Sequence, residues 1–129
     1  DKAARKITQV KDEKLNQVFR ERAEKNDKYA WENENFKVLI PHDISELYEE
    51  GRKLSHCVGT YGKVVAEGKS VVAFIRKASD VNTPLCTIEI RQNTIVQARG
   101  MSNRPAENIP NMRTFIKAWA KNKGLQYAA

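Results

Sequence analysis

The chain has little cysteine and no long hydrophobic segment, and both shortages narrow what it can be. Its 129 residues include two cysteines, without the regular spacing of a disulfide framework. No run of about 18 apolar residues occurs, which excludes a transmembrane helix, and no apolar signal-peptide core opens the chain. We expect a cytoplasmic protein without membrane insertion, and a fragment of a longer one because its first residue is Asp1 rather than Met.

Ligands for a metal ion are scarce as well. A structural zinc site takes about four Cys and His side chains. The chain has Cys57, Cys86, His42 and His56 and no others, so a zinc site would have to recruit every one of them. We therefore predict no bound metal and no cofactor.

Positive charge is in excess, and the excess lies in the second half of the chain. The formal net charge is +7. Residues 71–129 carry nine Lys and Arg against three Asp and Glu, whereas residues 1–70 are close to neutral. This asymmetry favours an anionic partner, most often nucleic acid. A solvated basic face on a helix explains it equally well.

Apolar residues at helical spacing predict four helices. The first covers about 11–29 and has a thin apolar stripe. A second runs from a capping box that begins at Asp43 and ends at Gly51. A third is capped by Ser55, and the last begins near Pro110.

Strands are predicted over 36–40, 71–76, 85–91 and 94–99, which are rich in β-branched residues. Gln92-Asn93 predicts a two-residue hairpin turn between the last two. The expected fold is α+β, with helices preceding a three-stranded antiparallel meander and a C-terminal helix closing the chain. We assign residues 1–35 to an N-terminal charged helix or connector, and residues 36–129 to the α+β domain.

The segment Leu54–Tyr61, Leu-Ser-His-Cys-Val-Gly-Thr-Tyr, is the most distinctive part of the sequence. Cys57 is expected at a helix start, where free N–H groups favour a thiolate, and cysteine hydrolases pair such a thiol with a His base. Adjacent residues of a helix point about 100° apart, so His56 is poorly oriented for that task. The other interpretation is a small buried cysteine beside a capping histidine. His56 and Cys57 are the catalytic candidates, and both interpretations stay open.

The predicted hairpin places two polar side chains on a strand face that is expected to be buried. With a two-residue turn, Gln97 faces Ile88 and Arg99 faces Cys86, so both polar residues share a face that should be buried. Buried polar groups need partners. Either they reach toward His56 or an anionic ligand at the rim of a site, or a shift of one residue turns both to solvent.

Further binding candidates surround these positions. Tyr61 closes the distinctive segment, and Arg76 ends a predicted strand. Asn103 and Arg104 follow Gly100 in a predicted turn. We expect the arginines to contribute to an electropositive surface.

An ordered series of short motifs resembles the PcfJ-like family. It comprises Val38–Pro41, Glu50–Tyr61, Gly68–Ser70, Phe74–Arg76, Thr87–Glu89, Gln97–Asn103 and Phe115–Trp119. The resemblance covers about residues 36–119, and the series is more specific than any one motif. The family often has a second His before the His-Cys pair; Ser55 stands there in this chain, which argues against an essential role for that His here.

The resemblance implies a bacterial protein of conjugative plasmids, phages and other mobile genetic elements. The family's namesake resembles an accessory factor of DNA transfer, so relaxosome and coupling proteins are implied as partners. His56, Cys57, Gln97, Arg99 and Asn103 match family positions. The resemblance supplies no established reaction.

Three functions fit these observations. The first, which we favour, is an accessory domain of mobile-element or conjugative DNA processing that binds nucleic acid or an acidic protein partner through the basic C-terminal half. The second is a hydrolase or transferase in which Cys57 is the nucleophile beside His56 and Gln97, and Arg99 or Asn103 holds an oxyanion or phosphate. The third is a protein-interaction domain, which predicts scattered basic residues.

Overall fold

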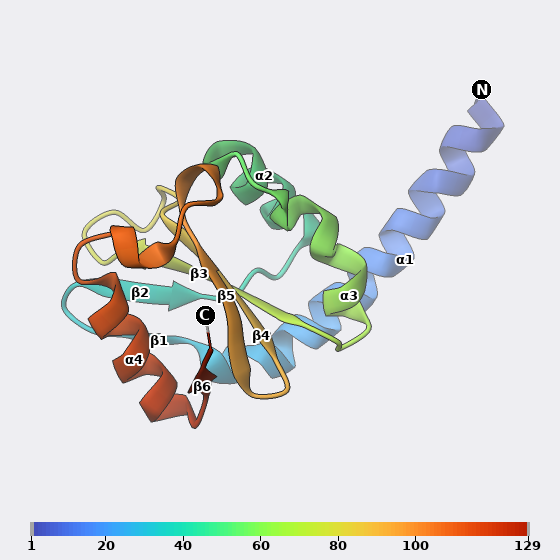
Figure 1. The fold of residues 1–129 in the computed structure, drawn as a ribbon. Coiled ribbons are helices and arrows are strands. Elements are labelled where there is room, and N and C mark those ends of the chain that lie inside the picture. The colour runs from blue at the N-terminus through green and yellow to red at the C-terminus, as the bar shows by residue number, and fades with distance from the viewer. Residues whose placement is uncertain (1, 129) are drawn as a thin grey trace.

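A mixed sheet lies between two layers of helix in the computed structural model, which describes residues 2–128 and the side chains from residue 13 onward (Figure 1). The helices are α1 (Lys2–Asn26), α2 (Ile44–Leu54), α3 (Gly62–Ala66) and α4 (Met112–Lys123). The strands are β1 (Trp31–Glu32), β2 (Phe36–Leu39), β3 (Val71–Lys77), β4 (Cys86–Arg91), β5 (Thr94–Arg99) and β6 (Gln126–Tyr127). Short 3₁₀ helices at Asp27–Tyr29, Cys57–Tyr61, Met101–Asn103 and Ala106–Asn108 connect them.

The six strands follow one another in chain order across the sheet. All neighbours are antiparallel except β5 and β6, which are parallel. The predicted mixture of helices and strands is confirmed, but the three-stranded sheet is wrong. The prediction missed β1 and β6, which have two residues each and no periodicity to detect, and β6 rather than a helix is the last element.

Each face of the sheet covers its own core. On one face, Ala73, Ile75, Ile88 and Ile90 pack against α4, whose Trp119 is fully buried. On the other face, β3 packs against α1, α2 and α3. The alternation of side chains along a strand explains the division, since successive residues point to opposite faces.

The N-terminus of α2 is fixed by the predicted capping box. The Asp43 side chain accepts a hydrogen bond from the Ser45 amide at 3.0 Å, and the Glu46 side chain accepts one from the Asp43 amide at 3.1 Å. Side-chain hydrogen bonds from Asn16 and Arg20 of α1, together with those of Ser45, hold the pKa of Asp43 well below its usual range. These contacts attach α1 to the start of α2.

Residues before 36 contribute to both cores. Phe19 of α1 is fully buried on one side of the sheet, and Tyr29 is buried on the other. The Tyr29 carbonyl accepts a hydrogen bond from Trp119 Nε1 at 2.7 Å. The division of the chain at residue 36 stays a prediction. No described helix combines the length and the hydrophobicity needed to cross a bilayer.

Candidate functional site

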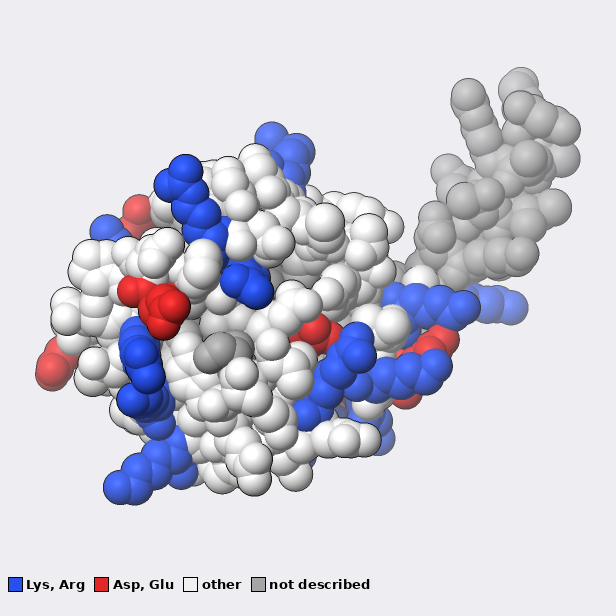
Figure 2. All heavy atoms as spheres, viewed as in Figure 1, with Lys and Arg blue, Asp and Glu red and all other residues white. Residues whose placement is uncertain are grey.

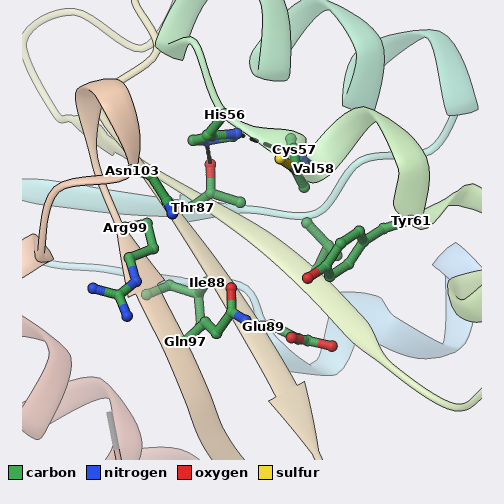
Figure 3. Close-up of a pocket in the computed structure, with 11 residues that line it drawn as sticks. His56, Cys57, Val58, Tyr61, Thr87, Ile88, Glu89, Gln97, Arg99 and Asn103 are labelled. Atoms are coloured by element: carbon green, nitrogen blue, oxygen red, sulfur yellow. Dashed lines mark hydrogen bonds between the residues drawn. The ribbon is translucent and has the colours of Figure 1, made fainter.

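Polar side chains from separate segments surround one pocket of about 230 Å³. The pocket lies on β4 and β5, beside the chain that connects α2 to α3. Figure 3 shows Tyr61 of the Cys57–Tyr61 helix, and His56 just before that helix, opposite Gln97 and Arg99 of β5. The lining comprises His56, Cys57, Val58, Tyr61, Val72, Thr87, Ile88, Glu89, Gln97, Arg99 and Asn103. The pocket thus brings together six of the eight predicted site residues.

The distinctive segment reaches the pocket because α2 continues to Leu54 instead of ending at Gly51. Ser55, predicted as a helix N-cap, instead ends α2 in the left-handed region, with φ 53°. The chain then folds back on Gly51, where a Cβ atom would lie 2.9 Å from the His56 carbonyl oxygen. Glycine is therefore needed at position 51 for close packing. The prediction had interpreted this glycine as the end of the helix.

His56 is the cap of the short 3₁₀ helix that follows. Its Nδ1 accepts a hydrogen bond from the Val58 amide at 3.4 Å, and its Nε2 lies 2.9 Å from Thr87 Oγ1. Acceptance at Nδ1 leaves the ring proton on Nε2, which donates to the threonine. Burial lowers the pKa of His56, so the neutral ring is favoured.

The thiol of Cys57 is exposed at the pocket, but His56 is not arranged to activate it. Both ring nitrogens of His56 already have partners, Val58 and Thr87. The predicted continuous helix is instead a five-residue 3₁₀ helix followed by the five-residue α3. The second cysteine is no alternative nucleophile, because burial raises the pKa of the Cys86 thiol to about 12.

A β-bulge in β5 decides where Gln97 and Arg99 point. The predicted pair Ile90–Ile95 is present, and Gln92 and Asn93 both have the positive φ of a tight hairpin turn. Past that pair the register shifts by one residue, so Gln97 lies opposite Glu89.

The bulge also overturns the predicted partner of Arg99, which lies opposite Thr87 rather than Cys86. Ala98 takes the core position beside Ile88. Gln97 and Arg99 are thereby turned away from the buried isoleucines and toward the pocket. The one-residue shift of the second predicted alternative is therefore present, and yet both side chains line a pocket with His56, as the first alternative expected.

Glu89 forms part of the pocket wall and was not among the predicted site residues. Its side chain is buried, and its Oε2 accepts hydrogen bonds from Ser70 Oγ and Arg91 Nε, each at 2.7 Å. Thr87, the partner of His56, was also missed. Both residues belong to the Thr87–Glu89 family motif, which could have pointed to them. A single acidic residue on a strand gave no reason to select Glu89 as a site residue.

Tyr61 and Asn103 complete the polar rim. Burial and the nearby charge of Glu89 raise the pKa of Tyr61, so its hydroxyl stays protonated and can donate a hydrogen bond. Asn103 is exposed and has φ 62° in the loop after β5. Arg99 forms no ion pair with any acidic side chain in the described part of the chain.

Two predicted binding residues lie outside the pocket. Arg76 points to α2, where its Nη2 donates to Glu50 Oε1 at 2.9 Å and also contacts Oε2. Glu50 is fully buried, and burial raises its pKa. Arg104 is exposed on the loop beyond Asn103. The sequence could not show that Arg76 has a partner 26 residues away.

The basic residues do not form one continuous surface on the face that Figure 2 shows. Lys and Arg side chains stand there in separate groups, with uncharged and acidic side chains between them. Arg113, Lys117 and Lys121 follow one exposed stripe of α4. Among the described residues, no three His, Cys, Asp or Glu side chains are placed to hold a metal ion.

Comparison with known proteins yields a family and an uncharacterised relative. The family described as PcfJ-like protein matches residues 1–112. "Uncharacterized protein Lin1253/Lin1744" of Listeria innocua serovar 6a is 32% identical over 135 aligned positions, which cover 99% of this chain. The chain spans 29% of that relative's length. No solved structure matches.

Proposed function

The chain belongs to the PcfJ-like family, and from that premise we propose that it binds nucleic acid as an accessory domain of DNA processing on mobile genetic elements. The pocket is the binding site, and it takes one unpaired nucleotide of a single strand. The observation that carries this proposal is Arg99, a cation without an acidic partner among the described residues, at a pocket rimmed by two amide side chains.

Arg99 supports binding of a phosphate at the rim. A guanidinium group presents a planar fork of donors that matches two oxygens of a phosphate. Arg91 differs, because Glu89 already engages it at 2.7 Å. Arg99 therefore has the free charge that a backbone phosphate would use.

The other rim residues suit a nucleotide base. Gln97 and Asn103 carry amides that can donate to and accept from a base edge. The Tyr61 ring offers a surface on which a base can stack. A pocket of about 230 Å³ is smaller than the roughly 300–1,000 Å³ of sites that enclose whole small molecules, which favours one nucleotide of a longer ligand.

A substitution at Arg99 tests the proposal. Arg99→Gln should weaken binding of a fluorescent single-stranded oligonucleotide roughly tenfold or more, because a charged hydrogen-bonded contact contributes about 1.5–3 kcal/mol. Fluorescence anisotropy at several salt concentrations measures the affinity. Arg104→Gln is the matched control, since it removes the same charge from the exposed loop outside the pocket.

Three outcomes contradict the proposal. Affinity that does not fall between low and moderate salt excludes phosphate contacts, because counterion release makes such binding steeply salt-dependent. Equal losses for Arg99→Gln and Arg104→Gln exclude a specific pocket. Binding of an acidic peptide but no oligonucleotide would assign the surface to a protein partner.

Relaxosome and coupling proteins, and the bacterial cytoplasm as location, belong to the same proposal. They rest on the family's association with mobile elements. The second candidate, a thiol enzyme, is favoured by one observation, the exposed Cys57 sulfur in the pocket. His56 does not act as the base of such an enzyme, because it is engaged at both ring nitrogens.

A further inference from the structure

A second hollow lies at the end of the sheet near the C-terminus of α1. Its volume is about 230 Å³, and it is bounded by that helix end, the turn after α3 and the β4–β5 hairpin turn. None of its lining residues lines the first pocket. Four cationic side chains and no carboxylate face it: Arg22, Lys25, Lys28 and Lys69.

Among the described residues, an acid pairs with one of these four cations. Lys69 contacts Glu67 at 2.8 Å. Asp27, at the end of α1, contacts His42 Nε2 at 2.7 Å instead. Arg22 and Lys25 form no ion pair with any acid among residues 13–128. Arg22, Lys25 and Lys28 therefore give this concavity a positive potential that no described acid offsets by an ion pair.

The guanidinium of Arg22 lies against the backbone of a glycine, Gly68. Gly68 has φ +75°, and a Cβ atom there would lie 2.6 Å from Arg22 Nη2 and 2.7 Å from its Cζ. Only glycine both adopts this backbone conformation readily and leaves room for the guanidinium. The Arg22 head thus lies at the wall of the hollow, with no acid among the described residues to account for its position.

Asn26 adds a neutral polar group to the wall of the hollow. It is 5% exposed as a residue, and its side chain lines the hollow. A ligand with oxygen acceptors in the hollow would satisfy its donors.

We propose that this hollow binds a phosphate group. Arg22 supplies a forked pair of donors, the lysines supply charge, and Asn26 supplies a neutral donor. The hollow adjoins the first pocket through one contact, because Ser70 in its wall donates to Glu89 of the pocket at 2.7 Å. The phosphate belongs either to a nucleic acid strand, in which case the inference rests on the proposed function, or to a free phosphate compound.

The test titrates inorganic pyrophosphate into the ¹⁵N-labelled full chain and follows amide chemical shifts. Shifts should concentrate on residues 22–28 and 67–70. The double variant Lys25→Gln/Lys28→Gln should weaken binding at least roughly tenfold, since each residue contributes a charged contact. Lys117→Gln/Lys121→Gln removes the same charge from the outer face of α4 and should leave the affinity unchanged. Thermal unfolding checks that each variant is folded.

A parallel series with a single-stranded oligonucleotide identifies the source of the phosphate. If the strand occupies the hollow, Lys25→Gln/Lys28→Gln makes the plot of log binding constant against log salt concentration less steep. Its slope falls by about two, which is about one for each lost phosphate contact. Pyrophosphate binding without oligonucleotide binding supports the hollow and refutes the proposed function. Oligonucleotide binding that both double variants weaken equally, with pyrophosphate still bound at the hollow, assigns the phosphate to a free compound rather than to the strand. The phosphate site is refuted if pyrophosphate moves amide chemical shifts scattered over the whole chain. It is also refuted if the two double variants bind pyrophosphate with equal affinity.

Discussion

Arg76→Met should be one of the most destabilising single substitutions in the domain. The Arg76 side chain is 13% exposed and Glu50 is fully buried, so the ion pair between them connects α2 to β3 largely out of water. Arg76 Nη1 also donates to the Val81 carbonyl at 2.8 Å. The substitution removes all these donors and leaves Glu50 without its partner.

The expected cost follows from the burial of the pair. Removing one partner of a buried ion pair typically costs about 3–5 kcal/mol, because the remaining charge is uncompensated. Replacing both partners with apolar residues of similar volume is often neutral or stabilising. We therefore expect Arg76→Met to lose about 3–5 kcal/mol of unfolding free energy, and Glu50→Leu/Arg76→Met to recover most of it.

Urea unfolding of the wild type, both single variants and the double variant measures this coupling. A cost below about 1 kcal/mol for Arg76→Met, the level of an exposed pair, would refute the reasoning. So would a double variant whose loss is the sum of the two single losses. At a temperature where Arg76→Met is folded, its oligonucleotide affinity should equal that of the wild type, unlike Arg99→Gln.

Two predictions concern the distinctive segment. Because burial lowers the pKa of His56, the unfolded chain takes up a proton first as the pH falls, so stability is lost as the pH drops below about 6.5. Urea midpoints should show this loss of stability in the wild type and in the control His42→Asn. The loss should be smaller in His56→Asn, which keeps a capping side chain. A loss in His56→Asn as large as that of the wild type would contradict the prediction. Cys57 should react with iodoacetamide no faster than a free thiol, since no base serves it, and Cys57→Ser gives the background; a large acceleration would favour the enzyme.

The local features of the fold were predictable because local chemistry determines them. The capping box at Asp43, the tight turn at Gln92-Asn93 and the apolar face of α4 all depend on residues within a few positions. The two-residue strands β1 and β6 were not predictable in this way. They are strands because neighbours already in the sheet offer hydrogen bonds, which is a property of the tertiary structure.

The location of the candidate site could be predicted from the sequence, but the orientation of its side chains could not. The sequence pattern drew attention to His56, Gln97, Arg99 and Asn103, and the structure gathers them at one pocket. The orientation of Gln97 and Arg99 depends on one extra residue in β5, and nothing in the alternation of residues 94–99 marks it.

Arg76 shows the limit of reading charge from the sequence. A basic residue at the end of a strand suggests a binding surface, but its role depends on which acid lies beside it in space. Here that acid is Glu50, from a helix formed 26 residues earlier. Arg99 has the same chemistry and no such neighbour among the described acids.

The short strands at the two borders of the sheet also affect how the domain behaves among other chains. A long unpaired border strand exposes a row of free N–H and C=O groups that can recruit a foreign strand and start aggregation. Here the borders are β1 and β6, with two residues each. Each of these two strands offers only two residues of backbone for the addition of a foreign strand.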